Sequence, residues 1–322
     1  MRMKNSTSLF YGVLLMLGLI APWVGIYPVY LMTLYCYAIF ACAFNLMLGF
    51  SGMLSFGHAA YFGFSSYITA HLITQHSMST LLAISLGVLA SSVLGLAIGF
   101  IAIRRSGIYF AMITLALSQL VYFVCLQASF TGGENGIQGV ARGDLLGLIS
   151  LKSDLWMYYF VLAVFVLTFL FILRVVHSPF GQVLKAIREN EARACSLGYF
   201  VDRQKLLVFV LSASLAGLAG ALKCVVLGFA ALSDVLQSTS GEVILMTMLG
   251  GAGTFFGPVL GAGIVVTLQD TLSDKVGSWV TVIIGGIFVI CVMAFRKGIV
   301  GEAQALIHRR QARTKVTQET AS

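Results

Sequence analysis

The sequence predicts an all-α polytopic integral membrane helical bundle of about eight to ten spans. Two observations carry this prediction, the composition and the spacing of the charged residues. Of the 322 residues, 59% are hydrophobic and only 10% are charged, whereas soluble domains carry about 25% charged residues. Asp, Glu, Lys and Arg are absent from residues 5–103 and from later runs at 106–133, 155–173, 206–222, 243–269 and 276–295. A helix crosses a bilayer with about 20 apolar residues. A soluble enzyme, a nucleic-acid-binding protein and a secreted disulfide scaffold are therefore excluded.

The apolar runs divide into individual spans. They are expected at about 9–26, 28–48, 56–74, 79–103, 107–128, 155–176 and 204–228, with shorter pieces at 236–252 and 257–272 and a last span at 278–295. Whether residues 236–272 cross twice or form one re-entrant pair stays open. Residues 1–295 are thus one membrane domain, with an outer loop at 129–154 and a charged loop at 177–200, and residues 296–322 are a basic cytoplasmic tail.

The basic residues set the orientation. If Arg2 and Lys4 are cytoplasmic, alternation of the spans places sixteen of the twenty Lys and Arg inside, all but Arg142, Lys152, Lys223 and Lys275. Because Lys and Arg are retained on the cytoplasmic side of membranes, both termini are expected in the cytoplasm. The net charge of +8 then reflects topology and contact with membrane lipid, with no nucleic acid as partner.

Two glycine-rich stretches interrupt apolar segments at similar places in the two halves of the chain. They read LGFSGMLSFG at 48–57 and LGGAGTFFG at 249–257. Broken helices expose backbone polar groups that only a protein-lined or watery cavity tolerates at membrane depth. The alternative is that the glycines only allow close helix packing. The candidate pathway residues are Gly49, Ser51, Gly52, Ser55, Gly57, His58, Gly250, Gly251, Gly253 and Gly257.

The loop at 177–200 contains a predicted amphipathic helix over residues 182–198. Its apolar residues follow helical spacing, the charged ones cover the remaining surface, and Gly198 ends it as a C′ glycine does. Such a helix between two spans is suited to a groove on a soluble partner. The alternative, a helix lying flat on the membrane, is disfavoured because anionic lipid would repel Glu189 and Glu191.

At this point the chain resembles the permease subunits of ABC importers, specifically the branched-chain amino acid permease family with its urea- and amide-transporting relatives. Several motifs in order carry the resemblance. They are NLMLGFSGMLSFGHAAYFGF at 45–64, GIYFAMITLALSQ at 107–119 with TGGENGI at 131–137, FGQVLKAIRENEARACSLGY at 180–199 with the span that follows, and SGEVILMTMLGGAGTFFGPVLGA at 240–262.

The resemblance implies that residues 182–198 are the coupling helix that docks on a cytoplasmic ATPase. The implied coupling residues are Lys185, Arg188, Glu189, Glu191, Arg193 and Gly198. It also implies a homologous second permease subunit, two ATPase subunits, an extracytoplasmic solute-binding protein, and the inner (plasma) membrane of a bacterial cell. The chain lacks a GxxxxGK[ST] phosphate loop, so it is expected to be no enzyme and to bind no cofactor, with ATP and Mg bound by the partner ATPases.

Three ionisable residues near the membrane need separate interpretations. His58 lies at the first glycine break and either contacts solute or bonds a backbone carbonyl freed by the break. Glu242 follows a Ser/Thr/Gly cluster, which is typical of a helix start with a favourable acid; a gate or a contact with a substrate ammonium group is the alternative. Lys223 is expected to snorkel to the outer interface, or to favour a carboxylate-bearing solute.

The outer loop carries a second motif, Thr131, Gly132, Gly133, Glu134, Asn135 and Gly136. It is either a turn-rich connector or a docking surface for the binding protein, with Thr131, Gly132, Gly133, Asn135 and Gly136 as the candidate residues.

Three functional classes are open to a polytopic membrane protein of this composition. An importer subunit taking up branched-chain or related amino acids by alternating access is favoured; urea or short amides are the alternative solutes. A gradient-driven secondary transporter is the alternative class, but it needs ionisable groups in mid-membrane. A membrane enzyme needs a cluster of catalytic or metal-binding groups, and the sequence shows no catalytic set and no Cys/His metal spacing.

Overall fold

The computed structural model describes residues 18–19, 21–25, 27–145 and 149–276, and positions 282–283, 285–286, 289, 293 and 298–302. The predicted spans at 9–26 and 278–295 and the basic tail therefore lie largely outside the described residues. The N-terminal described element is the short 3-10 helix η1 (Ala21–Val24).

The described chain is a bundle of long helices, which confirms the predicted fold class. The helices that correspond to predicted spans are α2 (Pro28–Ser51), α3 (His58–His76), α4 (Thr80–Ala102), α5 (Ile108–Gln127), α6 (Asp154–His177), α9 (Val201–Leu227), α10 (Gln237–Gly250) and α11 (Gly257–Val276). Within the described residues, five of them, α2, α4, α5, α6 and α9, are long and apolar enough to cross a membrane.

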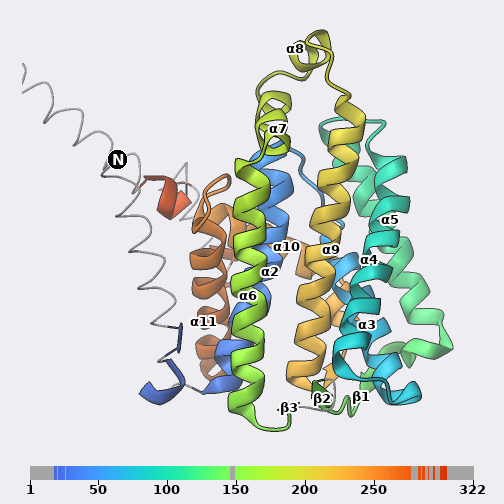
Figure 1. The fold of residues 1–322 in the computed structure, drawn as a ribbon, viewed down its shortest axis with the longest axis vertical. Helices are drawn as coiled ribbons and strands as arrows, with labels where there is room; N and C mark the ends of the chain where they lie inside the picture. The colour runs from blue at the N-terminus through green and yellow to red at the C-terminus, as the bar shows by residue number, and fades with distance from the viewer. Residues whose placement is uncertain are drawn as a thin grey trace, which may run out of the picture.

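The two ends of the bundle differ in structure. The charged loop forms two short helices, α7 (Pro179–Glu189) and α8 (Glu191–Ser196), which project from one end (Figure 1). The opposite end holds the remaining short elements, namely η2 (Ser129–Thr131), η3 (Gly133–Asn135), β1 (Ile137–Gln138), β2 (Asp144–Leu145), β3 (Ile149–Ser150), β4 (Phe229–Ala230) and η4 (Leu232–Val235). Two antiparallel ribbons form there: β1 pairs with β4, and β2 pairs with β3.

The core is built around α9, which packs against α2, α3 and α4. Small residues allow this approach: a β-carbon added to Gly220 of α9 would collide with the backbone of Phe62 in α3, and one added to Gly217 would collide with Ser91 in α4. Close packing of small residues is the usual way in which helices associate in membranes. In contrast, α4 presents Leu82, Leu89 and Phe100 at its outer surface, as a lipid-facing helix would.

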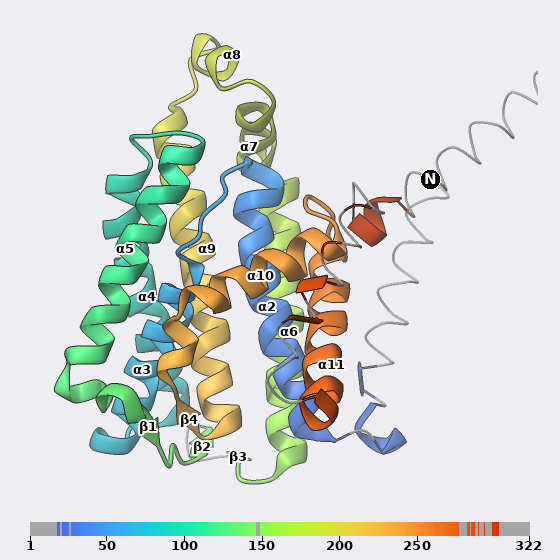
Figure 2. The same ribbon diagram turned by 180° about the vertical axis from the view of Figure 1, so that it is seen from behind.

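The glycine-rich stretches interrupt the helices as predicted. After α2 the chain runs through residues 52–57 without helical structure, down along the bundle to the start of α3 (Figure 2). Helix α10 crosses the bundle obliquely and is followed by the non-helical residues 251–256 before α11 begins (Figure 2).

Candidate functional site

The projecting segment is a helical hairpin, and the prediction of one helix over residues 182–198 is wrong. Helix α7 starts at Pro179, after Ser178, whose side chain accepts from Gly181 N. It stops at Asn190, which is extended (φ −159°), and the Asn190 Oδ1 atom accepts from Arg193 N at 2.9 Å to start α8. Asparagine favours such N-cap geometry over a helix interior. The predicted terminator Gly198 has φ +87° and follows the end of α8.

The hairpin is fixed to the membrane helices by apolar and ionic contacts. Ile187 of α7, Ala194 of α8 and Val201 of α9 form a small buried cluster. Beside it, Lys205 Nζ of α9 lies 2.5 Å from Glu191 Oε1 of α8. Lys205 is buried, so this pair ties α8 to α9. Sequence reasoning missed Lys205 because its partner lies on a different helix.

Arg188 joins the hairpin to the first glycine break. Its Nη1 donates a hydrogen bond to the carbonyl oxygen of Gly49, in the last turn of α2. Arg188 was expected to face an ATPase as part of the coupling set. The structure instead gives its guanidinium a partner inside this chain. Arg188 is itself exposed, as are the coupling candidates Glu189, Glu191, Arg193 and Gly198, whereas Lys185 is half-buried.

The two glycine breaks meet each other. Asn45 of α2 bridges them: its Nδ2 donates to Thr254 O at 2.9 Å, and its Oδ1 accepts from Gly253 N at 2.8 Å. Phe50 and Phe255 lie with their ring centres 5.4 Å apart. Of the candidate pathway glycines, Gly49 and Gly253 are therefore brought into direct contact, although 204 positions separate them in the sequence.

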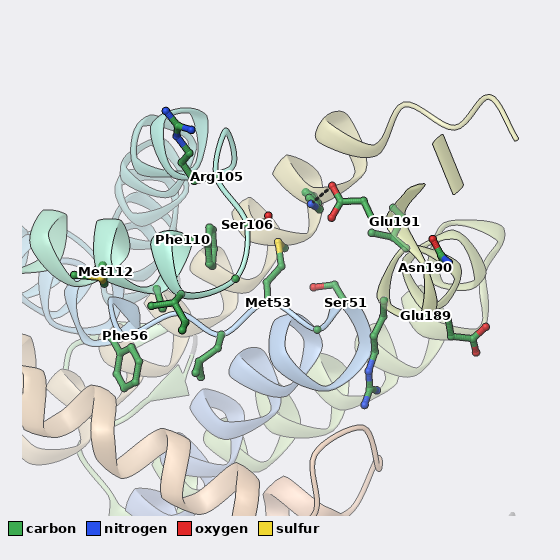
Figure 3. A pocket seen from close by; sticks show the side chains of 18 of the residues that line it. Ser51, Met53, Phe56, Arg105, Ser106, Phe110, Met112, Glu189, Asn190 and Glu191 are labelled. Atoms are coloured by element: carbon green, nitrogen blue, oxygen red, sulfur yellow. Dashed lines mark hydrogen bonds and ion pairs between the residues drawn. The ribbon is translucent and has the colours of Figure 1, made fainter. Parts of the chain in front are cut away.

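A cavity of about 600 Å³ opens between the first break, the start of α5 and the hairpin. The last residue of α2 and the connector to α3 contribute Ser51, Gly52, Met53, Leu54 and Phe56 to its wall. Opposite them lie residues of α5 and its preceding turn, Arg105, Ser106, Gly107, Ile108, Phe110, Ala111, Met112 and Leu115. In Figure 3, Met53 and Phe110 both line the cavity, whereas the charged ends of Arg105 and Glu189 turn away from it. The wall is mostly apolar, with charges at the rim.

Only part of the predicted pathway reaches this cavity. Ser51 and Gly52 line it. Ser55, Gly57 and His58 lie buried in the bundle. The second break, with Gly250, Gly251, Gly253 and Gly257, is absent from the described lining of this cavity.

His58 is a buried part of the helix packing. It is 1% exposed, and its Nε2 lies 2.8 Å from Ser212 Oγ of α9, which itself donates to Ala43 O at 2.6 Å. The backbone N–H of Ala59 donates to Ser240 Oγ at 2.9 Å. These bonds connect the start of α3 with α2, α9 and α10. The partner of His58 Nε2 is therefore a hydroxyl, and the carbonyl that this hydroxyl bonds, Ala43 O, lies within α2 and is not one freed by the break.

The sequence suggested that Lys223 snorkels to the outer interface, and the structure contradicts this. Its ammonium group is ion-paired with Asp234 of η4, and both residues are buried. Snorkelling requires a path to the headgroups, and Phe62 and Phe229 lie against the ammonium group instead. Asp234 was not singled out from the sequence, because it appears there as an ordinary loop acid.

Glu242 does not mark a helix start. Helix α10 begins at Gln237, so the Ser/Thr/Gly cluster lies inside the helix and Glu242 falls beyond its first turn. Its side chain is hydrogen-bonded to Gln269 of α11. The helix-dipole contribution is confined to the first turn, and the N-capping interpretation is therefore wrong.

The TGGENG motif folds as a compact turn. Thr131 is buried and its Oγ1 donates to Cys125 O at 2.5 Å. Gly132, Gly133 and Gly136 all adopt positive φ, which explains why glycine stands at these positions. Asn135 and Glu134 remain exposed. Close by, Arg142 donates to Val226 O at 2.8 Å and pairs with Asp154 at 2.5 Å, so the loop covers the end of α9.

Broken helices, a cavity at the break and a helical hairpin beside its mouth are the features of a multi-pass membrane transport protein. Comparison with known families agrees: the family described as "Branched-chain amino acid transport system / permease component" matches residues 28–293. The chain belongs to this family of permeases, whose members work with other subunits.

Curated relatives carry the same description. The permease protein LivM of a high-affinity branched-chain amino acid transport system from Salmonella typhimurium is 28% identical over 286 residues, covering 82% of this chain and 67% of the relative. A probable LivM protein from Methanocaldococcus jannaschii is 25% identical, covering 76% and 78%. The LivH permease of Escherichia coli is 23% identical, covering 83% and 92%. The comparison with solved structures gives no match.

Proposed function

We propose that this chain is a membrane-spanning subunit of an ATP-driven importer that takes up branched-chain amino acids by alternating access. The observation that carries the proposal is the α7–α8 hairpin. It ends in exposed apolar side chains: Leu197 is 67% exposed and Phe200 69%. Apolar side chains exposed at the polar end of a bundle are typical of a protein-docking surface.

The proposed function requires an assembly of several subunits. A homologous second permease subunit completes the membrane unit, two cytoplasmic ATPase subunits dock on the hairpins and bind ATP and Mg, and an extracytoplasmic binding protein docks at the opposite end. The exposed Asn135 and Glu134 of the TGGENG turn are suited to that second contact. The complex is placed in the inner membrane of a bacterial cell, with both termini of this chain in the cytoplasm.

The cavity at the first glycine break supports the direction of release. It lies at the hairpin end of the bundle, and its wall is mostly apolar with charges at the rim. An aliphatic amino acid needs such a surface for its side chain, and the charged rim suits its ammonium and carboxylate groups. ATP-driven closure of the ATPases would move the hairpins and open or close this end.

The test is reconstitution of the purified complex. The tagged chain is purified in mild detergent, its partners are identified by mass spectrometry, and the complex is placed in proteoliposomes with ATP inside and the binding protein outside. We expect P-loop ATPases and a second permease, with ATP-dependent uptake of radiolabelled leucine exceeding that of urea. Uptake of urea or acetamide instead of leucine would mean that the solute is urea or a short amide and not a branched-chain amino acid. Uptake driven by an ion gradient without any ATPase would replace the importer with a secondary transporter.

A further inference from the structure

Arg188 is exposed, yet its guanidinium is bonded within the chain, which the docking role does not explain. Its guanidinium bonds the Gly49 carbonyl, and its Cγ packs on Gly52, 3.0 Å from where a β-carbon would stand. The Nη1 atom also lies 3.1 Å from the β-carbon position of Gly253. One side chain of the hairpin therefore contacts both glycine breaks.

The end of α2 provides a suitable acceptor. Gly52 adopts φ +76° and closes the helix, with Gly52 N donating to Leu48 O at 3.2 Å and Met53 N donating to Met47 O at 3.3 Å. This cap leaves the Gly49 carbonyl in the last turn without an intrahelical partner. A cation is stabilised at a helix C-terminus, and a charged donor makes a stronger hydrogen bond than a neutral one.

The second break follows the first through Asn45. The amide of Asn45 holds Gly253 N and Thr254 O, and a β-carbon on Gly49 would collide with that amide and with Gly253 N. The absence of a side chain at Gly49 is thus required for the two breaks to touch. Displacement of the end of α2 would displace residues 251–256 as well.

Helix α7 can displace the end of α2 because it is packed tightly against the membrane helices. Leu184 and Ile187 are buried, and the helix contacts α2, α6 and α9. Arg188 is the next residue after Ile187, so a movement of the hairpin moves the guanidinium directly. Beyond Met53 the connector is non-helical as far as Gly57, and Phe56 N donates to Thr114 Oγ1 of α5 at 3.3 Å, so a change in direction at Gly52 would be passed on along the connector.

We propose that Arg188 is the positioning residue that transmits hairpin movement to both glycine breaks, and that its guanidinium serves this link rather than a contact with the ATPase. This inference rests on the proposed function, because it specifies how ATP-driven movement reaches the solute route. The Gly49 carbonyl is its acceptor, and the Asn45 amide passes the movement to the second break.

The experiment compares complete complexes in proteoliposomes. Arg188→Gln removes the charge, Arg188→Lys keeps it, and Arg104→Gln removes an exposed arginine of the same bundle end that no contact ties to the breaks. The measurements are the amount of co-purifying ATPase and the solute taken up per ATP hydrolysed.

For Arg188→Gln we expect unaltered ATPase recovery and a fall of about tenfold in solute taken up per ATP hydrolysed, since a hydrogen bond to a charged group is lost. Arg188→Lys is expected to restore part of this ratio, and Arg104→Gln to match the unsubstituted complex.

Two outcomes would overturn the inference while leaving the proposed function intact. One is an Arg188→Gln complex with an unaltered ratio. The other is an Arg188→Gln chain that folds but no longer retains the ATPase, which would make Arg188 a docking residue. If that variant does not fold, hydrogen exchange on the unsubstituted complex decides: residues 47–57 and 251–257 must change together on ATP binding, and a change in only one rejects the link. Absence of ATP-driven uptake by the unsubstituted complex would instead reject the proposed function itself.

Discussion

Lys223 of α9 and Asp234 of η4 form an ion pair inside the bundle, at the end opposite to the α7–α8 hairpin. Their side chains are only 9% and 4% exposed. The ammonium nitrogen lies 5.7 Å from the centre of the Phe62 ring and 6.0 Å from that of Phe229. Since neither charge reaches bulk solvent, each depends on the other for compensation. The pair fixes the turn between α9 and α10 to the core.

The first prediction concerns this pair. Lys223→Met leaves the Asp234 carboxylate buried without its partner, which should cost about 3–5 kcal/mol and lower the melting temperature of the purified chain. Adding Asp234→Asn removes the second charge and should recover most of that loss. Lys152→Met, at an exposed lysine of the outer loop, serves as the control. A double variant as unstable as Lys223→Met alone would show that the pair does not hold this turn.

The second prediction concerns the ion pair between α8 and α9. Glu191→Lys places a second cation beside buried Lys205 and should strongly reduce uptake, because repulsion would separate the hairpin from α9. Glu191→Lys combined with Lys205→Glu restores opposite charges and should recover at least a third of the uptake, since about 1 kcal/mol of a partly exposed pair is regained. Uptake assays in whole cells, with membrane levels measured in parallel, check this. No recovery in the swapped variant would mean that Glu191 acts on another molecule.

The third prediction compares two glycines. Gly49→Ala brings a methyl group into the Asn45 amide and the backbone of Gly253, which should destabilise the chain by about 1–3 kcal/mol and reduce uptake. Gly241→Ala is the matched control, because its β-carbon would meet open space within α10. That variant should be as stable or slightly more stable. The two melting temperatures test the contact between the breaks, and equal values would contradict it.

The fourth prediction separates packing from solute contact at the start of α3. Ser212→Ala leaves the buried His58 Nε2 without its partner, so the melting temperature should fall by an amount equivalent to about 1–3 kcal/mol. The KM for solute should stay unchanged, because neither residue lines the described cavity. A changed KM with an unchanged melting temperature would place His58 in the solute route.

The membrane spans were predictable because hydropathy is a local property. A helix such as α4 is specified by its own uncharged sequence, and its observed bounds, Thr80–Ala102, fall within the predicted 79–103. The glycine breaks were predictable for the same reason, since glycine adopts the positive φ seen at Gly52 and Gly253 without the steric cost that other residues meet. The division of the projecting segment at Asn190 was not predicted, because amphipathic spacing continues through it while a single side-chain cap interrupts it.

The sequence by itself therefore determined the class of protein, the described membrane helices and the place of each break, all of which depend on residues close together in the chain. Only the tertiary structure decided the partners: Lys223 with Asp234, Lys205 with Glu191, and Arg188 with Gly49. The physical reason is that a charge inside a low-dielectric bundle is stabilised only by groups within a few ångströms. Which groups those are depends on how separate helices pack, and helical spacing along one segment carries no record of it.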